Sequence, residues 1–214
     1  MSDSSITKFN LLNVIKDDLK DITRDDIEIL IDMSIDDGLL KDIPIIGNLF
    51  SVINISQKIK DWFFYKKIHK FLFSLASIEN EKRTKFIEQI GNSNDKKKIG
   101  EELIFMIERL DHIEKSLYLG ILFKAYILEE INYYKFTFLA NVIDRIFISD
   151  LNNFLKYENI DRETQQRCLH LGLFYLSIHE ETGVYGNKYV SDDFNITESG
   201  FDLKYILKRE RNFA

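Results

Sequence analysis

Few side chains that commonly carry chemistry occur in this chain, which has one cysteine and four histidines: His69, His112, His170 and His179. His179 opens HEETG, the first half of a zinc-protease motif, but no second histidine follows four residues later. Cys168 and His170 are two residues apart, and on a helix that spacing points side chains in different directions. These residues therefore predict no metal centre.

Phosphate-binding and calcium-binding loops are also incomplete. GNSNDKKKIG, at residues 91–100, combines glycine with lysines, but no Gly-Lys-Ser/Thr sequence follows a strand there. DMSIDDG, at residues 32–38, lacks the alternating ligands of a calcium loop. The acidic pairs Asp25–Asp26 and Asp36–Asp37 fit a solvated face. We therefore expect no enzymatic activity, no cofactor and no metal, since an enzyme would need a site assembled from residues distant in the sequence.

The composition favours a mainly α-helical fold. Of the 214 residues, 45% are hydrophobic and 30% are charged, which is typical of a globular chain rather than a disordered one. One proline and nine glycines leave few breaks, whereas a β-sandwich needs frequent turn residues. A single cysteine, no signal sequence and no apolar run of about 20 residues together predict a cytoplasmic protein.

The net charge of −6 is unevenly distributed along the chain. Residues 1–42 carry five basic and eleven acidic side chains, residues 43–98 carry eleven and five, and residues 99–214 carry thirteen and nineteen. The three blocks therefore have net charges of −6, +6 and −6. This order indicates either an anionic partner for the central block or complementarity between the blocks.

The apolar periodicity predicts a helical domain over residues 1–157 and a smaller module over residues 158–214. Within the domain we expect acidic N-terminal helices, then apolar and aromatic–basic helices, then an αα array, at residues 1–42, 43–78 and 100–157. Individual helices are predicted over 6–35, from Pro44 onward, and over 81–91, 101–110, 112–130 and 133–157, with a loop over 91–100.

The C-terminal module is expected to have a winged-helix-like α+β outline. A helix over 161–172 precedes turn signals at Gly183 and Gly186, and KYVSDDFNI, at residues 188–196, alternates like a strand. Thr197 is the expected N-cap of a final helix. The outline is therefore helix, hairpin, helix.

Winged helices invite comparison with DNA-binding modules, but the charge opposes that function here. The chain from residue 161 onward carries seven basic and nine acidic side chains. An excess of acids disfavours binding to a polyanion. We therefore expect the module to contact a protein, and DNA is not an expected partner.

Residues 43–73 combine an uncharged apolar helix with aromatic residues among lysines, and no charged side chain lies between Asp42 and Lys58. Such a pattern suits a bilayer interface, but it also suits a soluble bundle whose lysines extend outward. Three interpretations stay open: a core helix, conditional membrane engagement and a protein-binding groove. The candidate contacts with a membrane or partner are Ile45, Ile46, Leu49, Phe50, Ile53, Lys58, Trp62, Phe63, Phe64, Lys66 and Lys67.

IPIIG, at residues 43–47, and LHLGLFYL…FNITESGFDLKYIL, within residues 169–207, together resemble bacterial proteins of the abortive-infection alpha family. In that family a helical body precedes a module in which a helix ends in LGL and the next begins with LTxxG. The resemblance does not extend to residues 101–157. It implies a role in phage defence or as a toxin-like effector, and it transfers no catalytic residue. The matching positions are Leu171, Gly172, Leu173, Ile196, Thr197 and Gly200.

These observations lead to the hypothesis of a non-enzymatic bacterial phage-defence effector. At rest the acidic N-terminal helices would hold residues 43–73, which on release would engage the inner membrane and make the protein peripheral to it. The alternative is a soluble protein–protein interaction or regulatory module whose apolar helix stays in the core. Expected partners are another protein, a second copy of the chain, or an anionic membrane surface.

Overall fold

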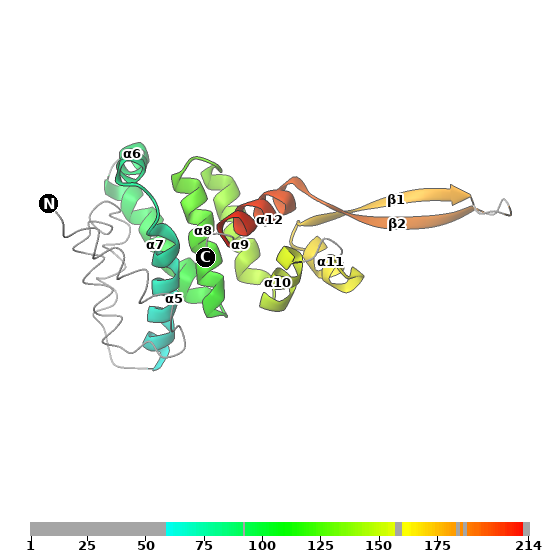
Figure 1. Cartoon of the computed structure of the whole chain (residues 1–214), viewed down its shortest axis with the longest axis horizontal. Coiled ribbons are helices and arrows are strands. Elements are labelled where there is room, and N and C mark those ends of the chain that lie inside the picture. The colour runs from blue at the N-terminus through cyan, green and yellow to red at the C-terminus, as the bar shows by residue number, and fades with distance from the viewer. Residues whose placement is uncertain (1–58, 92, 157–159, 183–184, 186–187, 212–214) are drawn as a thin grey trace.

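The computed structural model describes residues 59–91, 93–156, 160–182, 185 and 188–211. These residues form eight helices and one two-stranded antiparallel sheet, which confirms the predicted mainly helical fold with a small C-terminal α+β module. Figure 1 shows the helices as the body of the molecule and the two strands as a long hairpin projecting from it. The helices predicted over 6–35 and from Pro44 lie outside the described residues.

The helices are α5 (Ile59–Leu75), α6 (Asn80–Ile90), α7 (Ser93–Arg109), α8 (Ile113–Ile127), α9 (Tyr133–Arg145), α10 (Ile148–Lys156), α11 (Arg162–Leu169) and α12 (Glu198–Arg211). The strands are β1 (Phe174–Thr182) and β2 (Lys188–Ile196). The prediction of a strand over 188–196 is confirmed. The predicted turn glycines at 183 and 186 lie outside the described residues.

The predicted loop over residues 91–100 is wrong, because α7 begins at Ser93. Gly91 ends α6 with a positive φ of 82°, and the next helix starts two residues later. Lysine has a high helix propensity, so the run from Lys96 to Lys98 supports a helix rather than a loop. One glycine and several polar residues are therefore weaker loop signals than the prediction assumed.

The predicted helix over 133–157 is in fact two helices, α9 and α10. The backbone is extended at Ile146, where ψ is 140°, so α9 ends at Arg145. Asp150 lies in the first turn of α10, where a negative charge interacts favourably with the helix dipole. The break allows both Ile143 of α9 and Phe154 of α10 to be buried in the same core.

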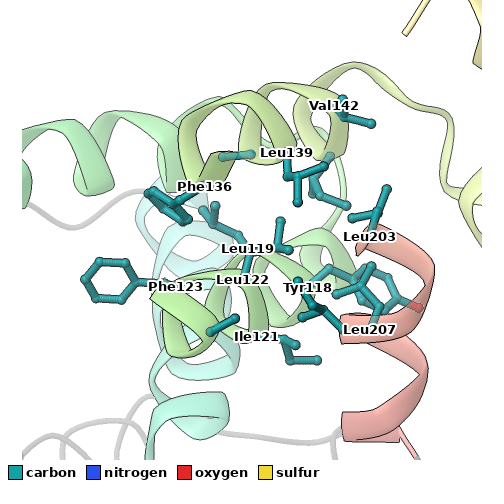
Figure 2. Close-up of a cluster of buried hydrophobic side chains, with 14 of the residues drawn as sticks. Tyr118, Leu119, Ile121, Leu122, Phe123, Phe136, Leu139, Val142, Leu203 and Leu207 are labelled. Atoms are coloured by element: carbon teal, nitrogen blue, oxygen red, sulfur yellow. The ribbon is translucent and has the colours of Figure 1, made fainter. Parts of the chain in front are cut away.

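Helix α8 is the centre of the fold. It is apolar on nearly every side, as expected of a helix surrounded by others, and α5, α9 and α12 pack against it. One contiguous hydrophobic core runs from α5 to α12. Figure 2 shows the middle of this core, where α8, α9 and α12 contribute Leu119, Leu122, Phe123, Phe136, Leu139, Leu203 and Leu207. The domain boundary predicted between residues 157 and 158 stays a prediction.

Gly120 sets how closely α5 and α8 approach. A Cβ atom at this position would lie 2.0 Å from Ser74 Oγ and 2.6 Å from the carbonyl oxygen of Phe71. Both distances are well below van der Waals contact, so a larger residue requires the helices to move apart. The close approach brings the buried rings of Phe71 and Phe123 together, with centroids 5.8 Å apart.

Candidate interaction surfaces

Six of the eleven residues predicted to contact a membrane or partner lie outside the described residues: Ile45, Ile46, Leu49, Phe50, Ile53 and Lys58. The other five belong to α5: Trp62, Phe63, Phe64, Lys66 and Lys67. For most of these five the structure also gives the surroundings of the side chain.

The predicted contacts on α5 do not form one exposed group. Phe63 is 51% exposed, whereas Phe64 packs against the hydrophobic core. The Lys67 ammonium group donates a 2.9 Å hydrogen bond to the carbonyl oxygen of Glu108 near the end of α7. Partial burial lowers the pKa of Lys67. Part of the predicted aromatic–basic set therefore joins α5 to the body, and Phe63 faces outward.

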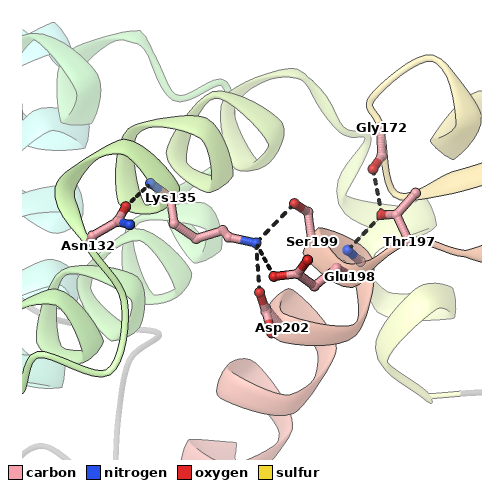
Figure 3. Close-up of polar contacts among 8 residues, drawn as sticks. Asn132, Lys135, Gly172, Thr197, Glu198, Ser199 and Asp202 are labelled. Atoms are coloured by element: carbon pink, nitrogen blue, oxygen red, sulfur yellow. Dashed lines mark hydrogen bonds and ion pairs between the residues drawn. The ribbon is translucent and has the colours of Figure 1, made fainter.

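The LGL and ITESG motifs of the family resemblance meet at the base of the β-hairpin, as Figure 3 shows for Thr197 and Gly172. The third motif, IPIIG, lies outside the described residues. Thr197 Oγ1 donates a 2.7 Å hydrogen bond to the carbonyl oxygen of Gly172, and its N–H donates one of 3.0 Å to that of Leu173. The same hydroxyl accepts a 3.0 Å hydrogen bond from the N–H of Gly200. Thr197 is therefore the N-cap predicted from the sequence, and it closes the hairpin at its base.

Both motif glycines are required by the geometry of this junction. Gly172 has a φ of 75°, in the left-handed region that glycine adopts without steric cost. At Gly200 a Cβ atom would lie 2.3 Å from the carbonyl oxygen of Leu173. The left-handed backbone at Gly172 and the close packing at Gly200 therefore explain the two glycines.

The aliphatic residues of the hairpin lie on one face, which also carries Asp192, opposite Ile178, and Glu180, opposite Val190. In an antiparallel pair, residues directly opposite each other lie on the same face. The register pairs Leu176 with Phe194, and it puts Ile178 and Val190 on that same face. Ile178 is 68% exposed and Val190 is 69% exposed. We call Leu176, Ile178, Val190 and Phe194 the hairpin apolar face.

The opposite face of the hairpin carries Tyr175 near the base and polar side chains that are hydrogen-bonded to one another. Asn195 Nδ2 donates a 2.7 Å hydrogen bond to Ser177 Oγ, and Ser191 Oγ donates one of 2.5 Å to Glu181 Oε1. These bonds join the two strands through side chains as well as through the backbone. The hairpin as a whole is acidic, since its strands carry one lysine, Lys188, and four carboxylates: Glu180, Glu181, Asp192 and Asp193.

Helix α11 covers the part of the hairpin apolar face nearest the body. The Arg162 guanidinium forms an ion pair with Asp192 at 2.5 Å and lies 5.4 Å from the ring centroid of Phe194. Ile178, directly opposite Asp192, and Val190, further out, are nevertheless largely exposed. The contacts of Arg162 therefore leave the aliphatic side chains of this face open to solvent.

Helix α11 is in turn held to α10 by a buried carboxylate. Arg167 donates two hydrogen bonds to Asp150, of 2.6 and 2.9 Å. Asp150 is buried, so this paired, bidentate geometry satisfies a charge that would otherwise be costly to bury. Asp161 caps α11 by accepting a 2.8 Å hydrogen bond from the N–H of Thr164.

Helix α12, which follows β2, is tied to the body by cations on other helices. Lys135 of α9 forms an ion pair with Asp202 at 2.8 Å and contacts Ser199 and Glu198 at 3.3 and 3.4 Å (Figure 3). Lys124 of α8 contacts the carboxylate of Glu210 at 2.6 Å, where both side chains are largely buried. The hairpin is therefore directly connected to a helix, α12, that ion pairs hold to the body.

Cys168 and His112 are two of the side chains considered above for catalysis or metal binding. Cys168 is buried, and His112 caps a helix. Burial raises the pKa of the Cys168 thiol to about 12, so the nucleophilic thiolate is scarce at neutral pH. His112 caps α8 by accepting a 3.2 Å hydrogen bond from the N–H of Glu114. Among the described residues, no group of three or more His, Cys, Asp or Glu side chains could hold a metal ion.

A small hollow lies between α7, α8 and α9, with Met106, Leu119 and Asp144 among its lining residues. Its volume is about 20 Å³. A site of this size holds about one water molecule. It is therefore too small to receive an organic substrate.

None of the hairpin's apolar residues was among the contacts predicted from the sequence. A signal is present, because apolar residues alternate at 174, 176 and 178. Alternation predicts a strand with one buried face, but it does not say whether the body of the same molecule covers that face. The structure supplies that information.

In the part of the chain that the structure describes, no helix has the length and apolarity needed to cross a bilayer. Comparison of the chain with protein-family models, curated protein sequences and solved structures gave no significant match. The resemblance to the abortive-infection alpha family therefore stays a prediction.

Proposed function

We propose that this protein is a non-enzymatic interaction module whose β-hairpin binds another protein through the hairpin apolar face. The exposure of Ile178 and Val190 on a hairpin that projects from the body carries this proposal. Scattered exposed apolar residues are normal, but apolar residues gathered on one exposed face mark contact sites.

The energetics of the hairpin favour the same function. A two-stranded hairpin with no further packing is marginally stable in water. Complete burial of an aliphatic side chain such as Ile178 contributes about 1.5–3 kcal/mol, and much of that gain is available here on binding. A partner that covers the hairpin apolar face therefore gains affinity and stabilises the hairpin.

The charge of the hairpin specifies the chemistry of the partner. Glu180 lies on the same face as Ile178 and Val190, since it is directly opposite Val190 in the register. With four carboxylates and one lysine, the hairpin attracts a basic surface and repels a polyanion. The partner is therefore a protein that presents apolar residues beside lysine or arginine.

Face-specific variants test this function. The tagged full-length chain is purified with its bound proteins from cells that express it naturally, as wild type, Ile178→Lys, Val190→Lys and His179→Lys. His179 is on the opposite face, its side chain is 55% exposed, and it serves as the matched control. We expect at least one protein to bind the wild type and His179→Lys equally and to be reduced at least about tenfold with the other two variants.

Two results contradict the proposal. In one, every co-purifying protein is retained by both Ile178→Lys and Val190→Lys. In the other, His179→Lys loses the same proteins to the same extent, which would show that binding does not depend on the face that carries Ile178. Raised salt should also weaken the contact, because the partner is expected to be basic.

A second candidate is the membrane-engaging phage-defence effector expected from the sequence. It is supported by the exposure of Phe63 on the same helix as Lys66 and Lys70, an arrangement suited to an anionic bilayer surface. The core packing of Phe64 and the hydrogen bond of Lys67 limit how much of α5 could take part without rearrangement.

Vesicle co-sedimentation tests this second candidate. The full-length chain, the Phe63→Ser variant and a chain lacking residues 1–37 are mixed with vesicles containing anionic lipid, at low and physiological salt. Binding with dye leakage that weakens with salt and with Phe63→Ser supports membrane engagement. No binding, even by the chain lacking residues 1–37, contradicts it.

A further inference from the structure

Helix α12 has two apolar stripes on opposite sides. Leu203, Ile206 and Leu207 are buried against the body, where α12 lies across α8, α9 and α10. On the outer side, Phe201 is 61% exposed and Tyr205 is 57% exposed. A helix that needed only to attach to its own core would be polar on this outer side.

The rings of the outer aromatic pair are parallel and lie beside an arginine. The rings of Phe201 and Tyr205 are stacked, with centroids 6.4 Å apart and planes 7° apart. The Arg209 guanidinium lies 5.7 Å from the Tyr205 ring centroid, and Glu130 fixes it through a 2.7 Å ion pair. Rigid aromatic residues beside an arginine are typical of the centres of protein interfaces.

The outer side of α12 is also complementary to itself. Glu198, Phe201, Tyr205 and Lys208 follow one another at steps of three, four and three residues, the spacing of a coiled-coil seam. When two such helices run antiparallel, Phe201 of each faces Tyr205 of the other, and Glu198 of each faces Lys208 of the other. The Glu198 side chain lies 3.4 Å from Lys135 but is 88% exposed, so a lysine of a second chain can also reach it.

We propose that a second copy of this chain docks on this surface, forming a twofold dimer through antiparallel α12 helices. The opposite charges at the two ends and the aromatic pair between them favour a second copy over an unrelated protein. The contact uses α12 and not the hairpin apolar face, so it is independent of the function proposed above.

The size of the surface sets the strength of the dimer. A phenylalanine or tyrosine ring buries roughly 150–250 Å² when fully covered, and these four rings are already partly covered. The area that these rings bury is therefore well below the roughly 1,200 Å² that a stable interface buries. We expect a monomer at low concentration and a dimer at high concentration.

Sedimentation velocity of the full-length chain, from about 1 to about 200 µM, tests the proposal. The wild type should shift from monomer to dimer over this range. Phe201→Ser/Tyr205→Ser should remain monomeric. Glu198→Lys and Lys208→Glu should each weaken the dimer severalfold, because each places like charges opposite one another, and the double variant Glu198→Lys/Lys208→Glu should restore it. Ile178→Lys, on the hairpin, should dimerise as the wild type does.

The double charge variant keeps the test independent of folding. It places a positive charge at the start of α12 and a negative charge near its end, which is unfavourable for the helix dipole. Restored dimerisation therefore cannot come from a more stable helix. A wild type that is monomeric throughout, a dimer that persists in Phe201→Ser/Tyr205→Ser, or a double variant no stronger than the single ones would each overturn the proposal.

Discussion

The hydroxyl of Thr197 donates a 2.7 Å hydrogen bond to the carbonyl oxygen of Gly172, joining two residues 25 positions apart at the two ends of the hairpin. The same hydroxyl caps α12, whose side chains are paired with cations of α8 and α9. One oxygen atom thus links the closure of the hairpin to its attachment to the core. The direction in which the hairpin apolar face points depends on this junction.

Replacing Thr197 by alanine should lower the free energy of unfolding by about 1–2 kcal/mol, since it removes an N-cap and a hydrogen bond to a backbone carbonyl. Thr197→Ser keeps the hydroxyl and should stay within about 0.5 kcal/mol of the wild type. Urea unfolding followed by circular dichroism measures both. If Thr197→Ser loses as much as Thr197→Ala, the hydroxyl is not what holds the junction.

Gly120→Ala should destabilise the fold by about 1–3 kcal/mol or more, because its Cβ atom would overlap both Ser74 Oγ and the carbonyl oxygen of Phe71. Adding Ser74→Ala removes only the first overlap, so the double variant should recover part of the loss. Thermal unfolding of the two single variants and the double variant checks this. Full stability in Gly120→Ala would show that α5 and α8 are not so closely packed.

Cys168 should be unreactive towards thiol reagents in the folded protein. It is fully buried, and burial raises the pKa of its thiol to about 12. Labelling near neutral pH should be at least about 100-fold slower in the native protein than in denaturant, with Cys168→Ser as the unlabelled control. Equal rates in the two conditions would contradict the buried position.

His69 should make the protein less stable in mild acid. Burial, with a smaller effect of Lys70, lowers the pKa of His69 below its usual 6.5. Below about pH 6.5, His69 is protonated in the unfolded chain but stays largely neutral in the folded chain until the pH is lower. The free energy of unfolding therefore decreases as the pH falls through this range.

The His69→Leu variant isolates this effect. Its free energy of unfolding should fall less between about pH 7.5 and about pH 5.5 than that of the wild type, because other acid-sensitive groups are common to both chains. Chemical unfolding at several pH values gives the two slopes. Identical slopes would mean that His69 does not titrate differently in the folded and unfolded states.

The fold could be predicted largely because local signals agree with the tertiary structure. Alternation in KYVSDDFNI predicted β2, and Thr197 predicted the start of α12. Two elements were predicted wrongly because a local signal competed with packing. The polar residues around Ser93 suggested a loop where α7 begins, and the apolar periodicity ran through Ile146, where the backbone becomes extended.

The candidate surfaces were harder to predict for a different reason. Ile178 and Leu203 are both aliphatic residues in periodic patterns, yet Ile178 is exposed on the hairpin and Leu203 is buried on the inner side of α12. Sequence periodicity defines a face but not what covers it. The same limit applied to α5, where Phe63 is exposed and its neighbour Phe64 packs against the core.

Photocrosslinking in living cells tests the central claim, that the hairpin apolar face binds a protein, most directly. A photoreactive benzoyl-phenylalanine replaces Ile178 in one full-length chain and His179, on the opposite face, in another. We predict a discrete crosslinked adduct from position 178 that is absent from position 179 and disappears when Val190→Lys is added. No adduct from position 178, or the same adducts from both positions, would contradict the account.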